Sequence, residues 1–177
     1  MMKILAFAAT NSRTSINKQL LQYAGSLLAD VEFELIDLND YELPLFSVDK
    51  EQELGQPELA QTFYQKMGAA DALIISFAEH NGSYTAAYKN LFDWTSRIDM
   101  KVFQNKPVVM LATSPGPGGA ASVLAAAVNS APYFAADVKA NVSVPSFYDN
   151  FDMTAGKLTE PELVAQMTQA LATLTSQ

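Results

Sequence analysis

The sequence contains no cysteine and only one histidine, His80. Without cysteine it can form no disulfide bond, no thiolate metal site and no thiol nucleophile. No group of histidine and carboxylate residues has metal-ligand spacing, so we expect no bound metal. A Ser-His-Asp hydrolase is conceivable because several serines accompany the histidine, but no G-x-S-x-G motif follows an apolar run. The chemistry of this chain must therefore come from other groups.

Basic residues and long apolar runs are also scarce. Eleven Lys and Arg oppose 19 Asp and Glu, which gives a formal net charge of −8. A phosphate backbone needs a basic face, so this balance argues against nucleic acid as a partner. No span of about 20 apolar residues could cross a membrane, and residues 4–9 are too short for the apolar region of a signal peptide. We expect a soluble, cytoplasmic protein.

The composition is that of a folded chain. Hydrophobic residues make up 49% of the 177 residues and charged residues 17%, which separates the chain from disordered segments. This length suits one domain with a sizeable core. We therefore expect a single domain over residues 1–177.

Five segments are predicted to be strands. Four apolar runs, at residues 4–9, 72–77, 107–112 and 138–144, do not alternate with polar residues. Such runs are typical of parallel strands covered on both faces. Residues 31–38 do alternate, which favours a strand at or near an edge of the sheet.

Helical patterns separate the strands, so the chain alternates between the two kinds of element. The predicted helices cover residues 15–28, 57–70, 85–97, 120–134 and 160–174. Right-handed crossovers then give an α/β fold, a doubly wound five-stranded parallel sheet of flavodoxin-like order 2-1-3-4-5. Residues 40–56, 78–83 and 114–119 are predicted to be irregular. Ligands of such sheets bind beyond the carboxyl ends of the strands, which points to the loops after strands one, three and four.

The loop after the first strand is rich in small donors. It contains Thr10, Asn11, Ser12, Arg13, Ser15 and Asn17. The free N–H groups of the following helix carry partial positive charge, so an anion such as a terminal phosphate would suit this loop. A plain polar turn with Ser15 as N-cap is the alternative. The loop lacks the lysine of a P-loop and the G-x-G-x-x-G pattern, which argues against ATP, GTP or a dinucleotide bound here.

The loops after the third and fourth strands complete the candidate site. The third strand is followed by Glu79, His80, Asn81, Gly82 and Ser83, and the fourth by Ser114, Gly118 and Gly119. We favour a packing or hydrogen-bonding role for His80 over acid–base catalysis. Glycines allow close approach of the backbone to a ligand, although a simple connecting turn would also explain those after the fourth strand.

These loops carry a family resemblance. The first is similar to G-S-x-R-x-x-S-x-N-x-x-L, with one residue fewer between its arginine and serine. The second is similar to P-E-Y-N-G-S-x-P-G-x-L-K-N-x-x-D-W, matched by Glu79, Asn81, Gly82, Ser83, Lys89, Asn90, Asp93 and Trp94, with His80 in place of the tyrosine. Residues 43–46 and Asp49 resemble an L-P-x-[FY]…D loop. The chain thus resembles the NADPH-dependent FMN reductases, flavodoxin-like flavoproteins that include quinone, azo-dye and chromate reductases.

The resemblance implies a cofactor and a reaction. FMN would place its phosphate in the first loop and its ring between the second and third, with the backbone amides of residues 81–83 at the pyrimidine edge. Hydride would pass from NAD(P)H through FMN to a quinone, an azo compound or free flavin, with no titrating catalytic residue. A homodimer or homotetramer is expected. A flavodoxin-type electron carrier, for which a charge of −8 is suitable, and a ligand-less interaction module remain alternatives.

Overall fold

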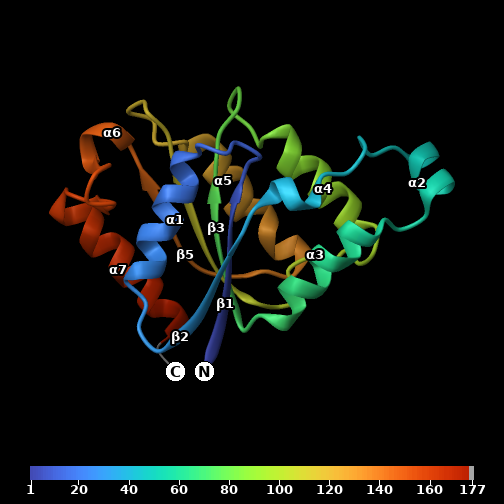
Figure 1. Cartoon of the computed structure of the whole chain (residues 1–177), viewed down its shortest axis with the longest axis horizontal. Coiled ribbons are helices and arrows are strands. Elements are labelled where there is room, and N and C mark those ends of the chain that lie inside the picture. The colour runs from blue at the N-terminus through green and yellow to red at the C-terminus, as the bar shows by residue number, and fades with distance from the viewer. Residues whose placement is uncertain (176–177) are drawn as a thin grey trace.

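The computed structural model describes residues 1–175, so the last two residues of the expected domain lie outside it. Its main sheet has five parallel strands in the order β2-β1-β3-β4-β5, which confirms the predicted topology (Figure 1). The strands are β1 (Met2–Ala9), β2 (Val31–Ile36), β3 (Ala72–Phe77), β4 (Pro107–Thr113) and β5 (Asp137–Val144).

Burial along the strands follows their place in the sheet. All six residues of β3 are buried, and so are the last six of β1 and of β4. These central strands have helices on both faces, which is why their sequences are continuously apolar. β2 and β5 form the two edges, and both alternate between more and less exposed residues. The alternation in β2 therefore marks an edge strand, as predicted.

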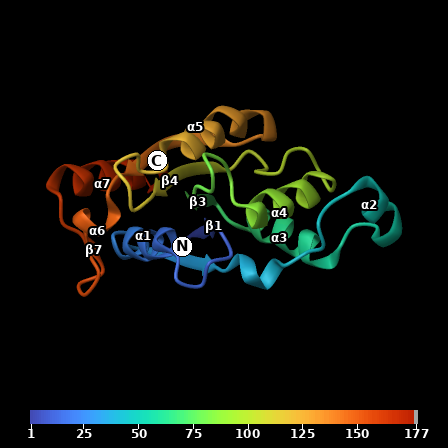
Figure 2. The ribbon, with the colours of Figure 1, turned by 90° about the horizontal axis from the view of Figure 1, so that it is seen from above.

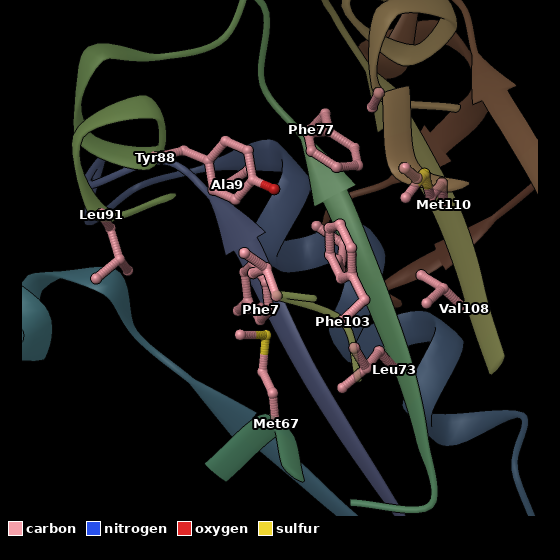
Figure 3. Packing of buried hydrophobic residues seen from close by; sticks show 14 of the residues in the cluster. Phe7, Ala9, Met67, Leu73, Phe77, Tyr88, Leu91, Phe103, Val108 and Met110 are labelled. Atoms are coloured by element: carbon pink, nitrogen blue, oxygen red, sulfur yellow. The ribbon is translucent and has the colours of Figure 1, made fainter. Parts of the chain in front are cut away.

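Helices cover both faces of the sheet. One core contains buried residues of α1 (Ile16–Ser26) and α7 (Pro161–Thr175). The other contains residues of α3 (Glu58–Ala69), α4 (Ala86–Ser96) and α5 (Ala121–Ser130). Figure 1 shows α1 and α7 on one side of the sheet and α3 and α4 on the other, and Figure 2 shows the same arrangement from above. Part of the second core, around Phe7 and Phe77, is drawn in Figure 3.

Short elements fill the connections after β2, α5 and β5. They are the 3-10 helices η1 (Leu38–Tyr41) and η2 (Ala131–Phe134), the single turn α6 (Phe147–Asn150), and a small hairpin of β6 (Phe151–Asp152) and β7 (Lys157–Leu158). The second strand was expected to reach residue 38 but ends at Ile36. A carboxylate oxygen of Asp37 accepts a hydrogen bond from the Asn39 N–H (2.9 Å) and begins η1 instead.

The expectation of irregular structure over residues 40–56 was wrong in part. This stretch contains α2 (Val48–Leu54), whose N-cap Ser47 accepts a hydrogen bond from the Lys50 N–H (3.0 Å). No residue of α2 is buried, so the helix lacks the apolar stripe by which helices are found in a sequence. It lies at one end of the molecule in both views (Figures 1 and 2). Within residues 1–175, no helix is both long and apolar enough to cross a membrane.

Candidate functional site

The carboxyl ends of β1, β3 and β4 meet at one edge of the sheet and form a single pocket of about 270 Å³. Its walls come from three loops and one later segment. They are Thr10, Ser12, Thr14, Ser15, Ile16, Asn17, Ala78, Glu79, His80, Thr113, Ser114, Pro115 and Tyr148. Segments far apart in the sequence thus meet where the sheet topology predicts a ligand site.

The first loop presents the beginning of α1 to this pocket. Ser15 is the N-cap, and its hydroxyl accepts a hydrogen bond from the Lys18 N–H (3.3 Å). The Thr10 hydroxyl accepts from the Ser12 N–H (3.2 Å), which folds the loop back on itself. Arg13 is exposed and is not part of the pocket wall. Asn11 borders a neighbouring pocket instead.

Asn17 lines the pocket, but its amide group is committed to the protein. The side chain is 2% exposed. Its carbonyl oxygen accepts hydrogen bonds from the Ser76 hydroxyl (2.7 Å) and the Thr113 N–H (3.1 Å), and its NH₂ donates to the Thr113 carbonyl (3.2 Å). Asn17 therefore joins α1 to the ends of β3 and β4, and it positions the loops around the pocket.

The loop after β3 is a tight hairpin turn. His80 and Ser83 exchange two backbone hydrogen bonds of 2.9 and 3.1 Å. Asn81 and Gly82 between them both have positive φ, 52° and 76°, which explains the Asn-Gly pair. The backbone amides of residues 81–83 were expected to face a ligand. The Ser83 N–H instead donates to the His80 carbonyl within the turn, which leaves the amides of Asn81 and Gly82 outside the two hydrogen bonds of the turn. Residues 81–83 are exposed beyond the pocket wall.

Glu79 connects this turn to the next helix. Its carboxylate accepts a hydrogen bond of 2.8 Å from the Val123 N–H in the first turn of α5. The N-cap of that helix, Ala120, has no side-chain oxygen to do this. A negative charge at a helix N-terminus is stabilising. Glu79 therefore borders the pocket while its carboxylate holds α5 in place.

The loop after β4 contributes Ser114 and Pro115 to the pocket, whereas the two predicted glycines lie outside its wall. Gly119 has a φ of 58°, and a Cβ there would collide with the Ser143 hydroxyl and lie 3.0 Å from the Pro145 nitrogen. Its carbonyl accepts a hydrogen bond from the same hydroxyl (2.8 Å). Gly119 thus permits close packing against the end of β5, and Gly118 is exposed.

Sequence reasoning missed two residues that shape this region. Thr85 is 1% exposed, and its hydroxyl donates to the Ala9 carbonyl (2.9 Å) and accepts from the Tyr88 N–H (3.2 Å), which ties α4 to the end of β1. Tyr148 lines the pocket from α6 and is 58% exposed. The carboxyl end of β5 opens onto the same edge of the sheet, and that was the signal that could have located Tyr148.

The part of the second motif that lies on α4 supports a loop rather than the pocket. Asn90 accepts a hydrogen bond from the Phe46 N–H (2.8 Å) and donates to the carbonyls of Leu43 and Pro44. The Trp94 indole N–H also donates to the Pro44 carbonyl (2.7 Å). These bonds fix residues 43–46 beside a second pocket of about 250 Å³, which borders Asn11.

Lys18 and Asp37 form an ion pair beside the first loop. Lys18 donates a hydrogen bond of 2.8 Å to Asp37, and together with the Asn39 N–H it lowers the pKa of that carboxyl to about 2, against a smaller opposing effect of burial. This pair connects α1 to the segment after β2. Among residues 1–175 no group of three or more histidine or carboxylate side chains could hold a metal ion.

A protein-family model and several known proteins match this chain. Residues 2–149 match the family model described as NADPH-dependent FMN reductase. The chain is 36% identical over 122 residues to a 2-hydroxy-1,4-benzoquinone reductase of Burkholderia sp, and 31% identical over 126 residues to an NADPH:quinone oxidoreductase of Arabidopsis thaliana. The matches cover 68% and 69% of this chain but only 64% and 63% of those two relatives.

A solved structure shows the same fold. The flavoenzyme NAD(P)H:(acceptor) oxidoreductase FerB from Paracoccus denitrificans superposes with a TM-score of 0.81 at 21% identity, covering 99% of this chain and 96% of that one. At this identity the likeness concerns the fold. The family match over residues 2–149 and the 36% identity to a reductase over two thirds of the chain show which family the chain belongs to. The chain belongs to the NADPH-dependent FMN reductase family.

Proposed function

We propose that this protein is an FMN-dependent NAD(P)H oxidoreductase that reduces a small acceptor such as a quinone, an azo compound or free flavin. The observation that supports this most is the single pocket formed by the loops after β1, β3 and β4. Family membership gives the cofactor class, and the names of the relatives give the acceptor class. The donor set of the pocket is consistent with both.

The α1 end of the pocket would hold the phosphate of FMN. The first N–H groups of a helix have no partners inside it and carry partial positive charge. Ser12, Thr14 and Ser15 add hydroxyl groups at the same end of the pocket. Arg13 lies between them in the sequence and is exposed, so its side chain is free to supply a full positive charge.

The other end of the pocket would hold the ring. When bound, FMN supplies the hydride chemistry, so the protein needs to bind, orient and desolvate rather than to donate a catalytic proton. The hairpin turn of residues 80–83 would place the N–H groups of Asn81 and Gly82 along an edge of the ring. Tyr148, which is 58% exposed at the rim, would cover one face. His80 would contact the ring without a required proton transfer.

The proposal is tested by the absorption spectrum of the purified protein, by FMN titration and by NADPH oxidation with menadione. We expect a flavin spectrum, or its appearance when FMN is added, and turnover. Arg13→Ala should weaken FMN binding by about 10- to 150-fold, the equivalent of roughly 1.5–3 kcal/mol for a charge-assisted bond. Lys139→Ala, on the far edge strand β5, is the control and should leave the affinity unchanged. A colourless protein that does not bind added FMN would refute the proposal.

The net charge of −8 favours one competing function, a flavodoxin-type electron carrier that docks through an acidic face. Such a carrier binds FMN but needs a separate reductase. Steady-state oxidation of NADPH or NADH by the protein alone therefore separates the two functions. A third alternative, an interaction module without ligand, would show no calorimetric heat with FMN at tens of micromolar.

We also propose a homodimer or homotetramer. Leu45, Val48 and Leu54, in and around α2, are 80%, 59% and 48% exposed, which is unusual for large apolar side chains gathered in one segment. Sedimentation velocity should give an oligomer, and Leu45→Glu combined with Val48→Glu should shift it toward the monomer. A monomeric wild type would contradict this. Use of NAD(P)H as the reductant supports a cytoplasmic location.

A further inference from the structure

A third cavity lies between α4 and α5. Its volume is about 340 Å³. Aromatic and methionine side chains form most of its wall, including Phe77, Tyr84, Phe92, Met110 and Phe134. It shares no wall residue with the pocket at the first loop. The cavity is therefore a separate space, and the proposed reaction does not use it.

The volume and lining of this cavity suit an apolar aromatic molecule. Ring pairs in its wall pack edge-to-face or tilted, with centroids 4.8 Å apart for Phe92 and Phe134 and 5.9 Å for Phe77 and Tyr84. Cavities that bind small ligands commonly measure about 300–1,000 Å³, and one of about 150 Å³ suffices for benzene. The observed volume is thus large enough for one or two fused rings.

The polar groups of the wall are paired, with one exception. Lys89 and Asp93 form an ion pair of 2.7 Å at the rim. The Tyr84 and Ser130 hydroxyls lie 3.4 Å apart and share a hydrogen bond, and the Ser96 hydroxyl donates to the Asp93 carbonyl. No free charge faces the cavity from residues 1–175, so its occupant should be neutral.

The exception is Tyr88, at the first turns of α4. The residue is 4% exposed, yet within the described chain its hydroxyl takes part in no hydrogen bond. Among the side-chain nitrogen and oxygen atoms of residues 1–175 that are shielded from solvent, only Oε1 of Gln56 lacks a hydrogen-bond partner. The Tyr88 hydroxyl, which also lacks a partner, is therefore not fully shielded and borders an open space. Tyr88 lines this cavity, and Figure 3 shows its hydroxyl pointing from α4 toward Phe77 on β3.

A hydroxyl that borders an open cavity and has no protein partner is free to donate its hydrogen bond to a ligand with an acceptor oxygen. Burial raises the pKa of Tyr88, and the neighbouring Tyr84 adds to this effect, so the group remains a neutral donor. We propose that the cavity between α4 and α5 binds a neutral aromatic carbonyl compound of one or two fused rings, whose carbonyl oxygen accepts a hydrogen bond from Tyr88. This proposal does not depend on the proposed redox function.

The test uses 1-tetralone, a bicyclic aromatic ketone, as the probe, and naphthalene as the matched ring without an acceptor. The protein carries ¹³C-labelled methionine methyl groups, and the titration is carried out both without FMN and with FMN added. We expect saturable shifts of Met110, which lines the cavity, and none of the exposed Met153. Tyr88→Phe should weaken 1-tetralone about five- to tenfold and leave naphthalene unchanged. Equal binding of 1-tetralone by wild type and Tyr88→Phe would refute the role of the hydroxyl.

A second pair of variants tests the location. Ala127 lines the cavity from α5 and is 3% exposed, whereas Ala126 on the same helix is exposed. Ala127→Leu should fill the space and abolish the probe-induced shift of Met110, and Ala126→Leu should bind the probe like the wild type. No saturable shift in the wild type at millimolar probe, or full binding by Ala127→Leu, would overturn the proposal. If Ala127→Leu fails to fold, the comparison of Tyr88→Phe with the wild type still decides it.

Discussion

Asn17 offers the clearest test of how the pocket is built. The resemblance assigns it to the cofactor, but its amide makes three hydrogen bonds to Ser76 and Thr113, which are 0% and 1% exposed. Asn17→Ala removes these bonds and leaves a buried hydroxyl, N–H and carbonyl without partners. Each such loss costs about 1–3 kcal/mol, and water from the adjacent pocket would replace part of it. We expect the free energy of unfolding to fall by about 2–4 kcal/mol.

The measurement is urea unfolding of the FMN-free protein, followed by circular dichroism at constant m-value. Asn11→Ala is the matched control, because Asn11 is exposed and only its backbone carbonyl accepts a hydrogen bond, from the Asn39 amide. This control should change stability by less than about 0.5 kcal/mol. If Asn17 only contacted FMN, Asn17→Ala would likewise leave the stability of the FMN-free protein unchanged. If Asn17→Ala unfolds at the wild-type urea concentration, the positioning role is wrong.

Three further predictions concern neighbouring contacts. The pKa of Asp37 is lowered in the folded protein, so its ionised carboxylate stabilises the fold above about pH 4, near its unfolded-state pKa, and this contribution is lost as the pH falls toward 2. Asp37→Asn should therefore lower the free energy of unfolding by about 1 kcal/mol at pH 7 and by almost nothing at pH 2, measured by urea titration. Gly119→Ala should cost about 2–3 kcal/mol in the same assay because of its positive φ and the contact with Ser143, while Gly118→Ala, with open space around it, should be neutral. Glu79→Ala should lower stability by about 1 kcal/mol through loss of the α5 cap, and Glu79→Gln, which keeps an acceptor oxygen, by less; equal losses would contradict the capping role.

The sheet was predictable because its central strands are buried on both faces. In a chain that alternates strands with amphipathic helices, a short continuous apolar run such as residues 72–77 predicts a strand buried on both faces. The observed β3 has those bounds. α2 could not be found in the same way. Its stability comes from the Ser47 cap and local backbone bonds rather than from burial, so no apolar period marks it.

The meeting of the loops after β1, β3 and β4 was predictable, whereas the contacts of their side chains were not. Strand order decides which loops meet, and order follows from the element pattern. What Glu79 or Asn17 touches depends on the neighbouring elements: Glu79 reaches the N-terminus of α5, 44 residues away, and Asn17 reaches Thr113, 96 residues away. Sequence spacing within a loop contains no information on such partners.

These contacts order the loops around the pocket in the absence of a ligand. A loop of small polar residues has few contacts of its own and would lose much conformational entropy on binding. Here Thr85 ties the start of α4 to the last residue of β1, and Asn90 ties residues 43–46 to the same helix. Much of the ordering is therefore complete before a ligand arrives. If FMN binds as proposed, residues that hold these loops together without touching it also increase its affinity. Thr85→Val should therefore weaken FMN binding, measured by titration, although Thr85 does not line the pocket.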